Sequence, residues 1–403
     1  MWTLGIDVAK HKHCAHLMDA EGQSLLQKFF FEQSAQGLNA LCTKLEELGA
    51  PKDELRIGME ATGNYWMILY GHFKQMGFEV LLLNPLITSA RRNFNVRGSK
   101  TDPDDARSIA MVLREEQVPV SAVADDDLRQ LRDLTRLRFD SMQQAVSEKL
   151  RLGALLDLAF PEYRKQFSDL FGATSLAVLE EYPTAAQLAR INIRRLTNLI
   201  QEASRGALGR QKAQHLRDAA RSSFAFTGND ATLGLEIRFA VQRINLLLEQ
   251  IDQLDTQLKF LLDEQQALLQ TIPGIGGVWA PTILAEVLPV FHPDDQRGAR
   301  TFVAIAGLDP KLNDSGQQKG RAKMSKRGSK YLRTAVMQAA EVAVHTTRDP
   351  MFAAIYNKHK ESGKHHTVAL SHVAHKMLHV IFSVLKNKRP YIPNMALNIN
   401  TSN

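Results

Sequence analysis

The sequence of 403 residues is poor in cysteine and has neither a long apolar run nor an excess of acid. Only Cys14 and Cys42 are present, too few for a disulfide framework or a thiolate zinc site, and this scarcity fits a reducing compartment. No apolar run approaches the ~20 residues that cross a bilayer. The chain opens at Met1-Trp-Thr-Leu without a charged leader or an apolar signal core. We therefore expect a cytoplasmic protein that does not enter a membrane.

Positive charge is in excess and is concentrated in one C-terminal segment. The chain carries 50 Lys and Arg against 43 Asp and Glu, a net charge of +7, which suits a nucleic-acid partner without establishing one. Between positions 311 and 333 the only acid is Asp314, and the basic residues are Lys311, Lys319, Arg321, Lys323, Lys326, Arg327, Lys330 and Arg333. Such a segment would neutralise phosphates and release counterions. A solvated loop is the alternative interpretation.

The length exceeds what one hydrophobic core usually supports, so we expect several domains. Short apolar strands and helices alternate at the N-terminal end in the order βββαβαβα, which describes a mixed sheet with helices packed on it. Ser34 is the expected N-cap of the first helix, which has Leu38, Leu41 and Leu45 on one face. This is the element order of an α/β RNase H-like (RuvC-like) fold, which we assign to residues 1–120.

The middle of the chain, residues 121–268, is predicted to be helical. One long helix begins near Leu128 and ends before Pro161, and a second runs from about Leu233 to Leu262. The second has apolar residues at the a and d positions of a heptad, interrupted once by Asp255. Two such helices predict a coiled-coil arm, either folded on itself or pairing two protomers. The stretch between them, about 164–230, is helical and basic, and its function is not readable.

Four acids follow the predicted elements of the N-terminal domain. Asp7 ends the first strand, Glu60 follows the fourth, and Asp102 and Asp105 open a helix at i, i+3 spacing. Because the first and fourth strands of an RNase H-like sheet are neighbours, the four carboxylates would converge and repel one another unless cations neutralised them. Hard oxygen ligands favour Mg²⁺, with Mn²⁺ as a substitute, in a two-ion site. Each acid alone has a structural explanation, and Asp104 at i+2 points away.

The C-terminal region, residues 269–390, is predicted to be mostly helical and to begin with a helix-hairpin-helix motif. Residues 269–284 read Leu-Gln-Thr-Ile-Pro-Gly-Ile-Gly-Gly-Val-Trp-Ala-Pro-Thr-Ile-Leu. Gly274 and Gly276 would let the turn approach a phosphate and present backbone N–H groups at a helix N-terminus. A plain helix-turn-helix connection is the alternative. Residues 391–403 are predicted to be a disordered tail.

Motifs at both ends of the chain resemble those of the DEDD-type insertion-sequence transposases, the family numbered one hundred and ten, which includes the Piv DNA invertases. The motifs are Gly-Ile-Asp7-Val-Ala-Lys, Met-Glu60-Ala-Thr-Gly, Lys-Thr-Asp102-Pro-Asp-Asp105-Ala, and Ala-Gly-Leu-Asp-Pro310 followed by Ser315-Gly316 and Ser-Lys-Arg-Gly. Together they are highly specific. The middle of the chain matches the family only as a helical arm.

The resemblance implies a transposase that cuts and rejoins DNA through a phosphoserine link. The tetrad Asp7, Glu60, Asp102 and Asp105 would act with a serine of the C-terminal domain, meeting it across subunits of a dimer or tetramer. Donor and target DNA would be recognised through a structured noncoding RNA, the bridge RNA. The alternatives are a protein-only site-specific invertase with the same residues, and a non-catalytic nucleic-acid-binding protein whose acids are structural.

Three serines compete for the role of nucleophile. Ser329 precedes an apolar helix and is most simply its N-cap, and Ser325 lies one turn earlier beside Lys326, where capping or a phosphate contact fits equally well. Ser315 lies in a predicted loop beside Gly316, at the start of the basic stretch. A serine nucleophile needs access and nearby positive charge, and the Ser-Gly pair matches the family pattern. We predict that Ser315 is the nucleophile, with Ser325 as the alternative.

Overall fold

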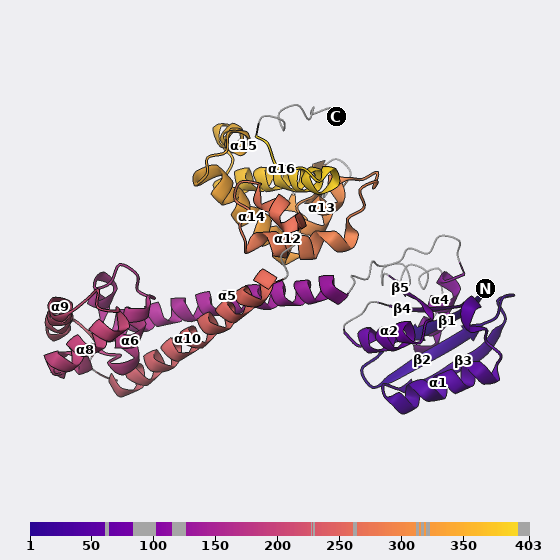
Figure 1. Ribbon diagram of the computed structural model, residues 1–403, viewed down its shortest axis with the longest axis horizontal. Coiled ribbons are helices and arrows are strands. Elements are labelled where there is room, and N and C mark those ends of the chain that lie inside the picture. The colour runs from indigo at the N-terminus through magenta and orange to yellow at the C-terminus, as the bar shows by residue number, and fades with distance from the viewer. Residues whose placement is uncertain are drawn as a thin grey trace. The chain divides into compact units, whose positions relative to one another are not determined.

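The computed structural model describes residues 1–60, 64–83, 102–114, 126–226, 228, 230–260, 264–311, 314–315, 318–319 and 323–393. The chain forms two compact units, Met1–Ala124 and Asp125–Asn403 (Figure 1). The predicted disordered tail lies outside the described residues from position 394 onward.

The N-terminal unit is a five-stranded mixed sheet flanked by helices (Figure 1). The strand order is β3-β2-β1-β4-β5, antiparallel from β1 through β2 to β3 and parallel from β1 through β4 to β5. Its elements are β1 (Trp2–Asp7), β2 (Lys12–Met18), β3 (Ser24–Glu32), α1 (Ala35–Glu47), a 3₁₀ helix (Lys52–Glu54), β4 (Leu55–Glu60), α2 (Trp66–Gln75), β5 (Glu79–Leu83) and α4 (Asp102–Val112). The predicted element order is confirmed for the described residues, and β1 and β4 are neighbours as predicted.

The two faces of this sheet are built differently. Leu4 and Ile6 of β1 are buried on the face that packs with α1 and α2. The opposite face carries Gly5 and Gly58 and is covered by α4. A Cβ atom at position 5 would come within 2.1 Å of the carbonyl oxygen of Ala106 on α4. Because only glycine permits this approach, α4 lies directly on β1.

Helix α4 runs antiparallel to β1. Arg114, beyond its C-terminal end, donates hydrogen bonds to the carbonyl oxygens of Asp19 (2.6 Å) and Ala20 (2.8 Å), in the turn between β2 and β3. That turn lies at the beginning of β1, since β2 is antiparallel to β1 with Met18 opposite Thr3. The N-terminal end of α4 therefore lies at the carboxyl end of β1.

The second unit contains an arm of two long helices. Helices α5 (Asp126–Ala159) and α10 (Asp230–Phe260) pack against each other within the chain (Figure 1), which is one of the two predicted arrangements. Pro161 begins a 3₁₀ helix (Pro161–Lys165) directly after α5, so the predicted stop is confirmed. Asp255, at the interrupted heptad position, forms a bidentate ion pair with buried Arg138 across the arm. This pair accounts for an acid in the apolar seam.

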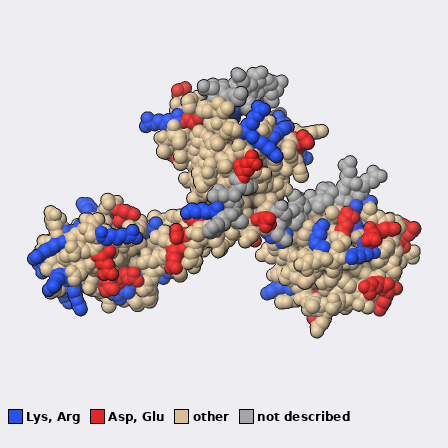
Figure 2. All heavy atoms as spheres, in the orientation of Figure 1, with Lys and Arg blue, Asp and Glu red and all other residues tan. Residues whose placement is uncertain are grey.

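The stretch between the long helices is a small helical subdomain with its own core. Its helices are α6 (Ala173–Glu181), α7 (Ala185–Arg190), α8 (Ile193–Ala203) and α9 (Arg210–Arg221). Figure 2 shows Lys and Arg side chains gathered at this end of the arm, where exposed arginines include Arg190, Arg194, Arg195, Arg205, Arg210 and Arg221. The predicted helical and basic character is confirmed.

The rest of the second unit is mostly helical, as predicted. Its elements are α11 (Glu264–Gln270), α12 (Trp279–Val287), a 3₁₀ helix (Leu288–Val290), α13 (Ala299–Ala306), β6 (Pro310–Lys311), β7 (Asp314–Ser315), β8 (Gln318–Lys319), β9 (Lys323–Met324), α14 (Lys330–His345), α15 (Pro350–Glu361) and α16 (His366–Asn387). The predicted loop between α13 and α14 is wrong in part, because β6 pairs with β9 and β7 with β8. Asp314 and Lys319 are register partners in the pairing of β7 with β8.

Helix α16 corrects the expectation that no segment approaches the length of a membrane span. It has 22 residues with a mean hydropathy of 1.4 over its most apolar window, enough by length and composition to cross a bilayer. Its apolar stripe, including Val373, Met377 and Ile381, is buried against neighbouring helices of the C-terminal core. Burial in that core accounts for the composition of the helix.

Candidate functional site

Two of the predicted acids lie at the carboxyl edge of the N-terminal sheet, on one face. Asp7 and Glu60 are the last residues of the neighbouring parallel strands β1 and β4. Side chains alternate along a strand with a period of two, so Asp7 shares the face of Gly5 and Glu60 shares the face of Gly58. Gly5 and Gly58 lie on the same face of the sheet, the face that α4 covers. The carboxylate positions of Asp7 and Glu60 are thus side by side beneath α4.

The other two predicted acids lie at the same edge, in the first turn of α4. Asp102 is the first residue of the helix, and its side chain lies outside the described part. Asp105 is half-buried and precedes fully buried Ile109 by one helical turn, whereas Asp104 is exposed. Because residues four apart share a helix face, position 105 faces the sheet. The structure therefore brings the backbone of all four predicted positions to one edge.

The donor set at this edge fits a hard divalent cation. Glu60 is only 8% exposed, and a charged carboxylate in such a place requires compensation by an opposite charge or by hydrogen bonds. The N-terminal end of α4 contributes a favourable dipole for negative charge. Oxygen ligands alone suit Mg²⁺ better than a softer metal.

A buried histidine under α4 adds no positive charge to this edge at neutral pH. His16 on β2 pairs with Gly5 in the sheet, and its Nε2 atom lies 2.9 Å from the Ser24 hydroxyl. Burial lowers the pKa of His16 to about 4, and the nearby positive charge of Arg107 on α4 contributes to this. Sequence reasoning missed this residue, since only the pairing of β1 with β2 places it beneath α4.

The structure gives two of the three candidate serines a local role. The Ser329 hydroxyl accepts a hydrogen bond from the Leu332 backbone N–H at 3.1 Å, so its predicted N-cap role is confirmed. The Ser325 hydroxyl donates to the Asp309 carboxylate at 2.5 Å, and its backbone N–H donates to the Asp309 carbonyl oxygen at 2.9 Å. Ser315 is the last residue of β7, and its register partner is Gln318 of β8.

Some of the predicted phosphate-binding residues of the basic segment are exposed and others make contacts within the chain. Lys326 and Arg327 are exposed in the turn before α14, where they are available to a phosphate. Arg321 lies outside the described residues, and only the backbone of Lys319 and Lys323 is described. Phosphate binding by Lys319, Arg321 and Lys323 stays a prediction.

Lys330 and Arg333 instead make contacts within the second unit. The Lys330 ammonium lies 3.0 Å from the Asp140 carboxylate on α5, and the Tyr331 hydroxyl donates to the same carboxylate at 2.9 Å. This pairing raises the pKa of Lys330. Arg333 donates to the carbonyl oxygen of Ala306, the last residue of α13, at 2.9 Å. Both contacts hold the beginning of α14 in place.

The predicted glycine turn connects α11 and α12. Gly274 has a φ of +87°, and a Cβ atom there would come within 2.0 Å of the Ala339 carbonyl oxygen on α14. Close helix packing therefore accounts for Gly274. Open space surrounds the corresponding position of Gly276, whose carbonyl oxygen accepts a hydrogen bond from Trp279. Of the two predicted glycines, Gly276 is the one with space for an external phosphate.

A cluster that the sequence analysis missed lies at the other end of α14. Glu341, His345 and His366 have ligand atoms within 4.8 Å of one another. The i, i+4 spacing of Glu341 and His345 was a readable signal. His366 comes from α16, so its approach depends on tertiary packing and could not be read from spacing.

Comparison with known families gives two matches on this chain. Residues 4–161 match a family model for DEDD transposases of the IS110 type, described as a transposase. Residues 266–357 match a model described as transposase of the IS116/IS110/IS902 family. The first match includes all four predicted acids, and the second includes all three candidate serines.

Relatives align with nearly the whole chain. The Insertion element IS116 uncharacterized 44.8 kDa protein of Streptomyces clavuligerus is 27% identical over 98% of this chain and 96% of its own length. The pilin gene-inverting protein of Moraxella bovis is 23% identical over 96% and 97%. The transposase for insertion sequence element IS1328 of Yersinia enterocolitica is 25% identical over 84% and 83%.

Proposed function

The chain belongs to the IS110 family of insertion-sequence transposases, and on that premise we propose that it cuts and rejoins DNA with an acidic tetrad and a serine nucleophile. The observation that carries the proposal is the convergence of β1, β4 and α4, whose ends bear Asp7, Glu60, Asp102 and Asp105. We assign the RNase H-like (RuvC-like) fold to this unit because its strand order and its acidic edge match that expectation.

The four carboxylates would hold Mg²⁺, or Mn²⁺ in its place, in an all-oxygen donor set. When bound, the cation would supply positive charge to stabilise the reacting phosphate. The fold positions these carboxylates. The glycines of β1 and β4 let α4 approach the sheet closely, and this approach places the first turn of α4 beside the strand ends. An error of about 1 Å in that placement would already weaken such a site.

Ser315 would carry the covalent step. Its hydroxyl oxygen attacks the phosphorus of a DNA phosphodiester and loses its proton to a nearby base, while the bond from phosphorus to one deoxyribose oxygen breaks and that oxygen takes up a proton. The products are a phosphoserine ester and a free DNA hydroxyl. Attack by the hydroxyl of another strand reverses the step and releases the serine. Each exchange conserves one phosphoester bond, so strand exchange needs no nucleotide as an energy source. The exposed Lys326 and Arg327 lie in the same segment and would attract the phosphate.

The proposed partners are donor and target DNA, a structured noncoding RNA, and further copies of the chain. The exposed arginines of the arm's subdomain support an RNA contact, because guanidinium groups suit phosphate recognition. Exposed apolar residues on the arm, among them Leu150, Phe239 and Leu246, support assembly into a dimer or tetramer through this surface. We place the protein in the cytoplasm, where DNA and RNA are accessible.

A protein-only DNA invertase is the second candidate function. The similarity to the pilin gene-inverting proteins over nearly the full chain favours it. Sequencing of the RNA that copurifies with the expressed protein separates the two. A single structured RNA encoded beside the coding sequence supports RNA guidance, whereas only bulk cellular RNA supports the invertase.

The function is tested with two neighbouring carboxylates in α4. The donor is a plasmid that carries the coding sequence with its native flanking DNA, and recombinant junctions are counted by quantitative PCR. Asp105→Asn is expected to lower junction formation by roughly 100-fold or more, because position 105 faces the sheet. Asp104→Asn, on the exposed side, is the matched control and is expected to keep most of the activity. Equal loss in both variants, or loss in neither, contradicts the assignment.

A further inference from the structure

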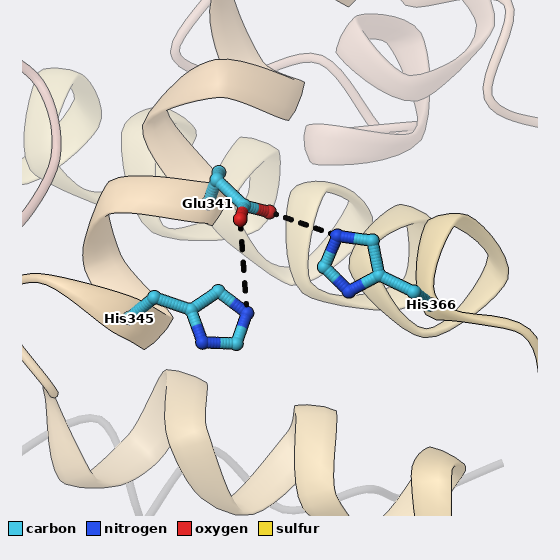
Figure 3. Close-up of side chains that lie close together, drawn as sticks. All are labelled: Glu341, His345 and His366. Atoms are coloured by element: carbon cyan, nitrogen blue, oxygen red, sulfur yellow. Dashed lines mark ion pairs between the residues drawn. The ribbon is translucent and has the colours of Figure 1, made fainter.

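The cluster of Glu341, His345 and His366 has the geometry of a metal-ion site separate from the acidic edge. Figure 3 shows the Glu341 carboxylate between the two imidazole rings. One carboxylate oxygen lies 3.8 Å from His345 Nε2 and the other lies 3.3 Å from His366 Nε2. The ligand atoms of all three residues lie within 4.8 Å of one another. In the part of the chain that the structure describes, no other group of three metal-ligating side chains approaches this closely.

These separations suit ligands that share one cation better than they suit direct hydrogen bonds. A hydrogen bond from a ring N–H to oxygen has a donor–acceptor distance of about 2.7–3.2 Å, and both N···O distances exceed it. Two ligand atoms each about 2.0–2.1 Å from a tetrahedral zinc ion lie about 3.3 Å apart. The distance from Glu341 to His366 has this value, whereas His345 Nε2, now 3.8 Å from the carboxylate, must move closer to share the ion.

The surroundings of His366 orient its ring for this role. The hydroxyl of Tyr356, on α15, lies 2.7 Å from His366 Nδ1, and Tyr356 is only 9% exposed. Metal-binding histidines characteristically have their second ring nitrogen fixed by such a partner. With Nδ1–H donating to the tyrosine oxygen, the lone pair of Nε2 faces Glu341. The His345 ring packs edge-on against Tyr356, with centroids 5.0 Å apart.

We propose that Glu341, His345 and His366 form a site for a divalent transition-metal ion, with Zn²⁺ as the best-matched ion. Two imidazoles and one carboxylate are softer than the all-oxygen set that Mg²⁺ prefers. Three protein ligands leave a fourth position for water or for an external ligand. Since the ligands come from α14 and α16 and the supporting tyrosine from α15, the bound ion pins these three helices together.

The test uses the purified full-length chain, stripped with a chelator and dialysed. Zn²⁺ binding is measured by calorimetry with Mg²⁺ in excess, so that oxygen-rich sites are already filled. Co²⁺ is added in a parallel experiment, because its visible absorption reports nitrogen ligands and tetrahedral geometry. The wild-type chain is expected to bind one Zn²⁺ and to melt at a higher temperature with Zn²⁺ than without it.

Three variants and one control decide the result. His366→Ala and Glu341→Gln are expected to abolish the Co²⁺ spectrum and the Zn²⁺-dependent rise in melting temperature. Tyr356→Phe retains the ring and is expected to weaken Zn²⁺ binding by roughly tenfold, which tests the site even if the other variants fold poorly. His372→Ala removes an exposed histidine of the same helix that stacks on His359, and it is expected to bind as the wild type does. Absence of Zn²⁺ binding by the wild type, or loss of binding in His372→Ala and not in Tyr356→Phe, overturns the proposal.

Discussion

At the scale of single residues, His16 couples protonation to the folding of the N-terminal unit. Burial sets the pKa of its ring at about 4 in the folded chain, below the value of about 6.5 in an unfolded chain. Between these values the unfolded state binds a proton that the folded state does not. The free energy of unfolding is therefore expected to fall as the pH drops from 6.5 to 4, by up to roughly 3 kcal/mol from this group.

The ring signal of His16 in NMR spectra tests this coupling. It is assigned by its absence in His16→Gln, and its midpoint is expected near pH 4. In the same variant, the loss of stability between pH 6.5 and 4 should be smaller than in the wild type. The matched control is His11→Gln, which changes an exposed histidine and should leave that loss unchanged. A His16 midpoint near 6.5 would show that α4 does not bury the ring.

Local residue roles were predictable from the sequence where the partner is close along the chain. The N-caps Ser34 and Ser329 each bond a backbone N–H three residues ahead, so local spacing was sufficient. The bond from Ser325 to Asp309 spans sixteen residues and depends on how the chain folds back between α13 and α14. The sequence therefore left Ser325 as an alternative nucleophile.

At the scale of secondary-structure elements, contact between α4 and β1 determines how the acids are placed. Gly5→Ala would bring a methyl group into the backbone of α4, at 2.1 Å from the Ala106 carbonyl oxygen. Either the helix shifts or the sheet distorts, at a cost of about 1–3 kcal/mol or more. We expect faster amide hydrogen exchange in β1 and α4, and reduced recombination as well.

Gly71→Ala is the matched control, because no atom lies near the added methyl group in helix α2. Alanine favours the helix by about 0.5–1 kcal/mol over glycine, so exchange in α2 should slow slightly and activity should persist. Unchanged exchange and activity in Gly5→Ala would contradict the close packing of α4 on β1.

Secondary-structure elements were predictable where the apolar periodicity is strong. The prediction failed for strands that pair over only two residues. The strands of the N-terminal sheet and the two long helices carry clear periods of two and of about 3.6 residues, and both are present. The two-residue strands between α13 and α14 carry no period, and the run of lysines resembles a solvated loop. The heptad pattern of α10 left two arrangements of the arm open, because the same apolar seam serves either partner.

At the scale of the whole molecule, the distribution of positive charge predicts RNA binding that depends steeply on salt. Each phosphate contact contributes about 0.7–0.9 to the slope of log K against log salt. Replacing Arg194, Arg205 and Arg210 with alanine should reduce the magnitude of that slope by roughly 2–3 if the arm's subdomain binds RNA. The measurement is filter binding of the copurified RNA over a range of salt concentrations. A flat dependence for the wild type would contradict RNA binding through phosphate neutralisation. An unchanged slope in the variant would place the RNA contact elsewhere on the chain.

The central claim is tested most directly by detecting a covalent bond between the protein and DNA. Wild-type protein is incubated with its RNA, donor and target DNA and Mg²⁺, quenched during strand exchange and digested for mass spectrometry. The account predicts a nucleotide attached to the peptide that contains Ser315, and it predicts no adduct in Ser315→Ala although this variant still binds RNA. Adducts that persist in Ser315→Ala and disappear in Ser325→Ala would contradict the account and assign the nucleophile to Ser325.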